Sequence, residues 1–160
     1  MTKQDFTEQV LARERTLYRV ARSMLRREAD QKDAVQETVA KAWAKRHTLR
    51  EERYFATWLT RILINECTNI ARRQKRIVLM RDWQEDALTA HAEFAEPSGV
   101  GEALDALPEA LRLPTVLHYM EGFSLCEIAH MLHLPLGTVK SRLHDARKAL
   151  QLELTNNEEA

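Results

Sequence analysis

The sequence is poor in residues that break helices and in residues that cross-link small folds. Its 160 residues include only four glycines, four prolines and two cysteines. This scarcity, together with abundant Ala, Leu, Arg and Glu, indicates an all-helical protein, and no window shows the apolar alternation of a strand. Cys67 and Cys126 stand alone without C-x-x-C spacing, so a disulfide framework is not expected.

Long apolar runs and enzyme motifs are also missing. No stretch approaches the roughly 18 apolar residues of a membrane span, and the first ten residues lack the basic-then-apolar layout of a secretory signal. We therefore expect a cytoplasmic protein. The sequence contains no P-loop, no HExxH helix and no nucleophile–base–acid set, so we expect no enzyme, no cofactor and no small-molecule substrate. The hydrophobic fraction of 44% still leaves enough apolar residues for a core.

The net charge is zero, but the charges are segregated along the chain. Residues 1–76 hold 18 Lys/Arg against 10 Asp/Glu, a net of +8. Residues 77–101 hold one Arg against five acids, and residues 102–160 hold five Lys/Arg against nine acids, a net of −4 in each case. The basic first part favours a surface that faces a polyanion, although a solvated basic surface would have the same composition.

A change in composition divides the chain near residues 85–101, where small and acidic residues precede the Pro-Ser-Gly cluster of a typical linker. Before it, the apolar spacing predicts three main helices at about residues 6–27, 30–45 and 55–73. After it, we expect helices at about 102–106, 109–120, 124–132 and 136–153. We predict two small helical domains, residues 1–76 (a bundle of three to four helices) and 102–154, with a flexible linker at 77–101 and a tail at 155–160.

The stretch HLPLGTVKSRLHDARKAL, at residues 133–150, has the pattern of a helix with one apolar and one free polar face. Its apolar residues recur at steps of three and four, which predicts a stripe that faces the core. The expected core-facing residues are Leu136, Val139, Leu143, Ala146 and Leu150. The polar and small residues Gly137, Lys140, Ser141, His144 and Lys148 share a separate, exposed arc.

The residues just before this helix predict a helix-turn-helix. Ser124 and Glu127 fit a capping box that opens a short apolar helix, and Pro135 fits the opening of the next helix after the turn HLP. Gly137 and Thr138 at the start of that helix allow its backbone to approach a phosphate closely. Two short helices with a basic strip on the second form a helix-turn-helix, and the alternative is an ordinary helical hairpin.

The segment ALDALPEALRLPTVLHYMEGFSLCEIAHMLHLPLGTVKSRLHDARKAL resembles region 4 of sigma factors of the extracytoplasmic-function (ECF) class, and GTVKSRL is its most specific part. The resemblance implies that the last helix reads the minus-35 promoter element from the major groove. The implied DNA contacts are Thr138, Lys140, Ser141, Arg142, His144 and Lys148. Of these, Lys140, Ser141 and His144 match base-facing positions, and Arg142 and Lys148 suit phosphates. Asp145 stands where many relatives carry a basic residue.

The stretch DQKDAVQETVAKAW, at residues 30–43, is similar to region 2.2 of the same family. Its helical spacing buries Val35, Val39 and Trp43 and leaves a charged strip outward. Taken alone, that strip fits a solvated face better than a docking surface. The resemblance implies that Asp33, Gln36 and Glu37 dock on the clamp helices of the RNA polymerase beta-prime subunit. Lys41 also points outward in this pattern, and Lys32 replaces the usual acid before Asp33.

The stretch TLREERYFATWLTRILINECTNIARRQKR, at residues 48–76, looks like regions 2.3 and 2.4. Opening a duplex requires holding bases out of the stack, which flat apolar surfaces and amide side chains can do. The resemblance implies a pocket for a flipped minus-10 base in the loop 48–54 and a base contact by Asn65. The implied minus-10 contacts are Leu49, Tyr54, Arg61, Asn65, Arg72 and Arg73, and Lys75 and Arg76 add charge for phosphates. Leu49 stands where relatives often have an aromatic residue. Phe55 and Trp58 share the inward face with Ile62, so we expect them in the core rather than as stacking platforms.

These patterns together predict an ECF sigma factor that binds core RNA polymerase, through the beta-prime clamp helices and the beta subunit, and directs it to promoter DNA. It would help melt the minus-10 element, and the family implies an anti-sigma partner. One alternative is a stand-alone helix-turn-helix regulator, because TVKSRL also resembles the recognition helices of response-regulator output domains. Such a protein would need a dimer interface or a receiver domain. Another alternative, a scaffold for acidic partners, leaves the helix-turn-helix unexplained.

One cluster has the spacing of a metal site. Cys126, His130 and His133 lie at i, i+4 and i+7 and could share one helix face. A fourth ligand is not identifiable, so we predict no metal.

Overall fold

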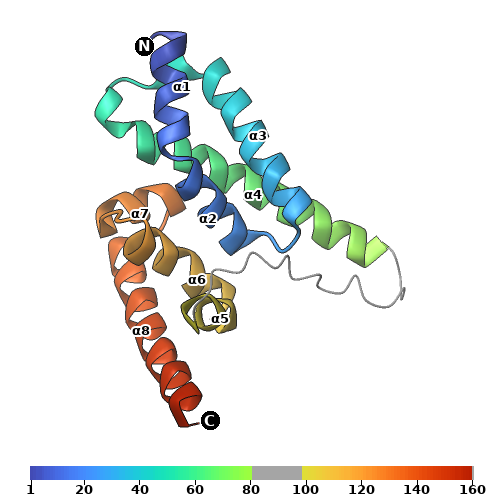
Figure 1. Ribbon diagram of the computed structural model, residues 1–160, viewed down its shortest axis with the longest axis vertical. Helices are drawn as coiled ribbons and strands as arrows, with labels where there is room; N and C mark the ends of the chain where they lie inside the picture. Colours follow the sequence, from blue (N-terminus) through green and yellow to red (C-terminus); the bar gives the residue numbers. More distant parts are fainter. Residues whose placement is uncertain (81–98, 160) are drawn as a thin grey trace. The chain divides into compact units, whose positions relative to one another are not determined.

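The computed structural model describes residues 1–80 and 99–159, with side chains up to residue 152. All regular elements in these residues are helical, which confirms the expected all-α class (Figure 1). The chain divides into two compact units, Met1–Ala92 and Glu93–Ala160.

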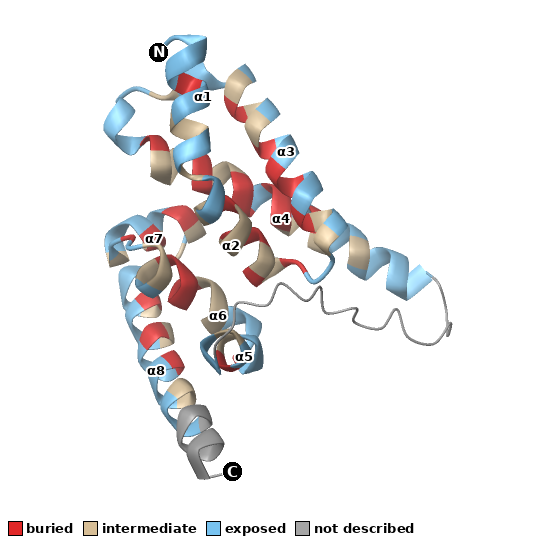
Figure 2. Ribbon diagram, viewed as in Figure 1, coloured by how far each residue is buried: buried red, intermediate tan, exposed pale blue. Residues whose placement is uncertain are grey.

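The first unit contains α1 (Lys3–Ala12), α2 (Glu14–Met24), α3 (Glu28–Ala44) and α4 (Phe55–Met80). Two 3₁₀ turns, Arg46–Thr48 and Glu52–Tyr54, connect α3 to α4. The helices α2, α3 and α4 pack on one another, and Figure 2 shows their buried residues in red. The large apolar side chains that are fully buried in this core include Leu17, Val20, Phe55, Leu59 and Leu63, none above 1% exposure.

The single helix expected at residues 6–27 is wrong, because the chain breaks at Arg13 into α1 and α2. Arg13 leaves the helical conformation at φ −113° and ψ 10°. The break directs α1 so that the Phe6 ring meets Trp43 edge-on at 5.1 Å and Phe55 at 5.9 Å between ring centroids. Burial of Phe6 therefore decides the path of α1, and no glycine or proline marks the break in the sequence.

The helix α3 lies where a helix was expected, at about residues 30–45, but it buries different residues. Val39 and Trp43 are half-exposed, whereas the polar Gln31 and Thr38 are buried. Gln31 Nε2 donates to the Leu25 carbonyl at 2.8 Å, and Thr38 Oγ1 donates to the carbonyl four residues earlier at 2.7 Å. Each buried polar group is thus satisfied by a backbone oxygen, which removes the main cost of burying it.

The second unit contains α5 (Gly99–Ala106), α6 (Glu109–Thr115), a π-helical turn η3 (Val116–Met120), α7 (Leu125–Leu132) and α8 (Leu136–Glu159). Its core joins α8 to the three helices before it. The core residues with the least exposure are Leu117, Ile128, Met131, Val139, Leu143 and Ala146. Arg112 on α6 donates to the carbonyls of Leu104, Asp105 and Leu107 at 2.7–3.1 Å, so this cation caps the C-terminal end of α5.

Helices extend into the ranges where we expected the linker and the tail. Residues 77–80 continue α4, residues 99–101 begin α5, and residues 155–159 continue α8. The remainder of the predicted linker, residues 81–98, lies outside the described residues.

Candidate nucleic-acid interface

Local capping builds a helix-turn-helix from α7 and α8. The Ser124 hydroxyl accepts from the Glu127 N–H at 3.1 Å and starts α7. At the other end His133 adopts the left-handed conformation (φ 54°, ψ 43°), and the Leu134 N–H donates to the Ala129 carbonyl at 3.0 Å. The Pro135 carbonyl then accepts from the N–H groups of Thr138 and Val139 in the first turn of α8. The short α7 and the longer α8 are joined by this tight turn, as the sequence predicted.

The two faces of α8 separate as expected, apart from the first residue. Val139, Leu143 and Ala146 are at most 1% exposed, and Leu150 is half-buried. Leu136 was expected in the core but is 38% exposed, because α8 begins there and the turn carries its side chain out of the stripe.

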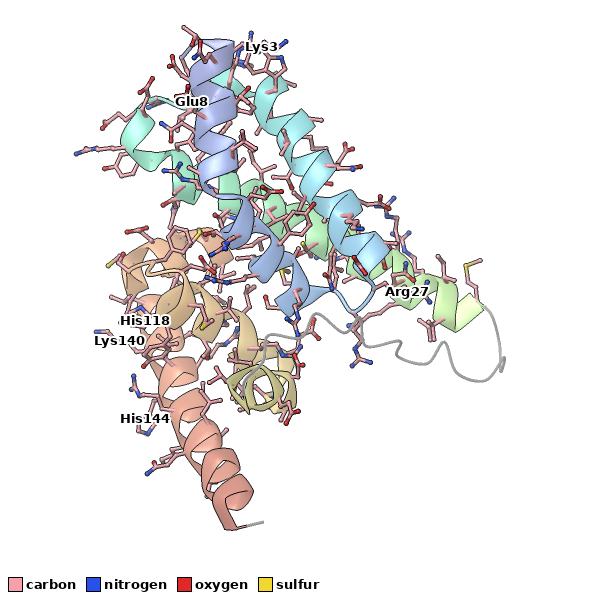
Figure 3. The ribbon with its side chains drawn as sticks, viewed as in Figure 1. Lys3, Glu8, Arg27, His118, Lys140 and His144 are labelled. Carbon is pink, nitrogen blue, oxygen red and sulfur yellow. The ribbon has the colours of Figure 1, made fainter. Side chains whose placement is uncertain are left out.

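The polar residues predicted on the other arc of α8 are all exposed, and we call them the α8 face: Gly137, Lys140, Ser141, His144 and Lys148. Figure 3 shows Lys140 and His144 on the same side of the helix. Thr138 and Arg142 are half-buried at its edge, and Asp145 is exposed. The α8 face is thus free to meet a partner while the helix holds to the core by its other side.

The positive charge of the second unit is concentrated on α8. Residues 102–160 carry five Lys/Arg, and four of them, Lys140, Arg142, Arg147 and Lys148, lie on this helix. The fifth, Arg112, is engaged by three backbone carbonyls. A unit of net negative charge therefore presents a locally basic helix, which suits a phosphate backbone.

A polar strip runs along α4 opposite its buried side. Arg61, Asn65 and Arg72 lie at i, i+4 and i+11 and so fall within about 40° around the helix. Asn69 lies one turn after Asn65 on the same side and is also exposed, so these four residues form the α4 strip. Asn69 was not among the residues predicted from the sequence, although its spacing of four from Asn65 places it on the same side of the helix. Arg73 is exposed on an adjacent side of α4, about 120° from Arg61.

The loop before α4 carries exposed aromatic surface. Tyr54 is 51% exposed, and the Arg53 guanidinium lies 4.7 Å from the centre of its ring. Leu49 is half-buried. Phe55 is fully buried as predicted, but Trp58, expected in the core, is half-exposed. The Trp58 Nε1 group donates to Thr48 Oγ1 at 3.3 Å, so this side chain fastens the loop to α4 and remains partly open to solvent.

Three exposed residues of α3 form the α3 strip: Asp33, Gln36 and Glu37. The opposite side of α3 is buried. Lys41, predicted to point outward, is instead half-buried and forms an ion pair with Glu66 of α4, whose side chain is 9% exposed. The Lys41 ammonium also lies 3.9 Å from the Glu37 carboxylate, so it connects the α3 strip to α4.

The residues with possible metal spacing do not form a site. Cys126, His130 and His133 are all exposed. Within the parts of the chain that the structure describes, no group of three or more His, Cys, Asp or Glu side chains could hold a metal ion. Among the same residues, no helix is both long and apolar enough to cross a bilayer.

Family models match both units of the chain. The model of sigma-70 region 2 matches residues 10–77, and that of sigma-70 region 4 matches residues 99–150. The chain is 32% identical over 142 residues to the RNA polymerase sigma factor SigV of Bacillus subtilis (strain 168), covering 88% of this chain and 86% of that protein. It is also 32% identical over 141 residues to the ECF RNA polymerase sigma-E factor of Escherichia coli (strain K12), covering 76% and 72%.

Solved structures agree with these matches. The sigma factor RpoE of Bartonella quintana, in complex with the anti-sigma factor NepR, superposes with a TM-score of 0.80 at 29% identity, covering 95% of this chain and 98% of that one. CnrH, in complex with the cytosolic domain of CnrY, gives a TM-score of 0.70 at 28% identity, covering 97% and 90%. Neither a stand-alone regulator nor a scaffold accounts for a match to both sigma regions. The chain therefore belongs to the sigma-70 family and is an ECF sigma factor, which binds core RNA polymerase and directs transcription initiation at promoter DNA.

Proposed function

We propose that this sigma factor divides its work among the three surfaces described above: the α8 face reads the minus-35 element, the α4 strip with its preceding loop opens the minus-10 element, and the α3 strip docks on core polymerase. The observation that carries the proposal is the exposed polar face of α8, held to the core by the buried Val139, Leu143 and Ala146 within a helix-turn-helix.

The α8 face has side chains suited to the major groove. Lys140, Ser141 and His144 lie in the first half of α8, where a recognition helix approaches base edges most closely. A lysine donates well to the guanine acceptors O6 and N7, and each good base contact contributes discrimination. Thr138, Arg142 and Lys148 act on phosphates, which position the helix without reading sequence. Asp145 weakens phosphate contact nearby unless it accepts from a cytosine amine.

The minus-10 surface combines aromatic rings, amides and cations. Tyr54 and Trp58 offer exposed ring area for an unstacked base, and Leu49 contributes apolar surface in the same loop. The amides of Asn65 and Asn69 supply donors and acceptors for base edges. Phosphate charge comes from Arg61, Arg72 and Arg73, with Lys75 and Arg76 further along α4.

The α3 strip is suited to a protein partner because it is polar, exposed and fixed on a rigid helix. We propose that Asp33, Gln36 and Glu37 contact the beta-prime clamp helices and that the region 4 unit contacts the beta subunit.

The protein itself performs no catalysis, since its part is to bind and position the polymerase. It acts in the cytoplasm, where core polymerase and promoter DNA are found. Because RpoE and CnrH are seen in complex with NepR and CnrY, we propose that an anti-sigma factor also holds this protein.

Transcription in vitro with purified core RNA polymerase tests the proposal. Run-off product should form only when the full-length protein, the core enzyme and a promoter with both elements are combined. Tight, sequence-specific binding to duplex promoter without polymerase would instead support a stand-alone regulator, because a region 4 unit of net charge −4 attracts DNA weakly by itself.

A further inference from the structure

A hydrogen bond joins the turn before the helix-turn-helix to the recognition helix. Arg147 Nη1 on α8 donates to the Tyr119 hydroxyl oxygen on η3 at 2.8 Å, across 28 residues of chain. Both side chains are exposed, and Tyr119 is 50% exposed. The two elements can be found in Figure 3 through His118 on η3 and Lys140 and His144 on α8. Tyr119 belongs to none of the surfaces described above, and Arg147 lies outside the α8 face and contributes only to the overall positive charge of α8.

The position of Arg147 brings it into line with the proposed DNA contacts. It lies seven residues after Lys140, and seven residues return to within about 20° of the same side of a helix. Asp145, the exposed acid of this helix, lies about 160° away around the axis. The positive charge of Arg147 therefore extends the row begun by Lys140, on the side away from that carboxylate.

The hydrogen bond leaves donors available for a phosphate. A guanidinium has five N–H donors in one plane, and the bond to Tyr119 uses one of them. The phenol oxygen accepts this bond, so its own O–H remains free to donate. Two adjacent side chains thus present donors to an acceptor-only group such as a phosphate oxygen. Because the donors lie side by side, they can bind the same phosphate group.

The structure also holds this pair in place before any ligand binds. The Tyr119 ring meets the His118 ring edge-on, with 4.9 Å between centroids. The Nδ1 atom of His118 lies 2.8 Å from the Phe123 carbonyl oxygen, and since a carbonyl only accepts, this nitrogen donates. The contact with His118 therefore restrains the Tyr119 ring, and the Tyr119 hydroxyl restrains the long Arg147 side chain. Because both side chains are already restrained, less conformational entropy is lost on binding.

We propose that Tyr119 and Arg147 together bind one backbone phosphate of the minus-35 duplex, at the edge of the groove that receives α8. This inference rests on the proposed reading of the minus-35 element by the α8 face. The contact is independent of sequence and sets how deeply and in which register the recognition helix lies.

Neutralising single phosphates tests the contact. Full-length protein with core polymerase is bound to promoter duplexes in which each phosphate around the minus-35 element is replaced in turn by a methylphosphonate. Arg147→Met should bind the unmodified duplex about fivefold more weakly at low salt, and the slope of log K against log salt should fall by about 1. At one position the methylphosphonate should weaken binding by the wild type but leave binding by Arg147→Met unchanged. Tyr119→Phe should weaken binding less and add nothing in the Arg147→Met background.

Lys148→Met is the matched control, since it removes a cation from the same helix and should lose sensitivity at a different phosphate. The inference is overturned if Lys148→Met weakens binding but Arg147→Met does not, or if Arg147→Met stays sensitive at every phosphate; both outcomes leave the minus-35 assignment standing. If Lys140→Ala and Lys148→Met also leave binding unchanged, the proposed function of the α8 face itself fails. Helical circular dichroism and the thermal midpoint verify that each variant is folded.

Discussion

Replacing Lys41 with methionine should destabilise the first unit more than the loss of an exposed ion pair would. The change keeps the apolar stem but removes the cation beside Glu66, whose side chain is 9% exposed. Breaking a buried ion pair by removing one partner costs about 3–5 kcal/mol, whereas an exposed pair contributes at most about 1 kcal/mol. Because the Lys41 side chain is 39% exposed, we expect an intermediate loss of about 2 kcal/mol in the free energy of unfolding.

Two further variants distinguish the loss of this ion pair from a general effect of removing a lysine. In Lys41→Met/Glu66→Leu no charge is left buried, so stability should return to within about 1 kcal/mol of the wild type. Lys32→Met removes an exposed i,i+4 pair with Glu28 (3.2 Å), and should cost no more than about 0.5 kcal/mol.

Urea unfolding followed by tryptophan fluorescence is the assay, because Trp43 and Trp58 lie in the first unit and residues 93–160 contain no tryptophan. The reasoning is refuted if Lys41→Met is as mild as Lys32→Met, or if the double variant is no more stable than Lys41→Met alone.

Three further predictions follow from the described surfaces. Burial, and to a lesser extent the nearby Glu66, raises the pKa of Cys67 to about 12, so alkylation at pH 8 followed by mass spectrometry should label the exposed Cys126 and spare Cys67 until the protein unfolds. Alanine at all three residues of the α3 strip should weaken co-purification with core polymerase while the helical circular dichroism stays unchanged, since these side chains are exposed; unaltered core binding would remove the docking assignment. In transcription from a randomised minus-35 library, Lys140→Ala and His144→Ala should change the preferred bases, and Lys148→Ala should lower output evenly. A uniform loss with the wild-type preference profile in the first two variants would show that they do not read bases.

Local sequence patterns are sufficient to predict the features that depend on neighbours within one or two turns. The stripe of Val139, Leu143 and Ala146 follows from helical periodicity, and the start of α7 follows from the Ser124 cap. Local patterns of this kind also carry the resemblance to sigma regions 2 and 4, which is why the family could be recognised before the fold was known.

Features in which distant residues meet depend on the packing of the helices and could not be predicted from local patterns. The break at Arg13 follows from the packing of Phe6 on Trp43 and Phe55, which a continuous amphipathic pattern does not reveal. Lys41 meets Glu66 across 25 residues, and Arg147 meets Tyr119 across 28. Periodicity fixes which face of a helix a residue occupies, but the residue it contacts depends on how separate helices pack. That packing is set by the collective burial of the core, so no local spacing encodes it.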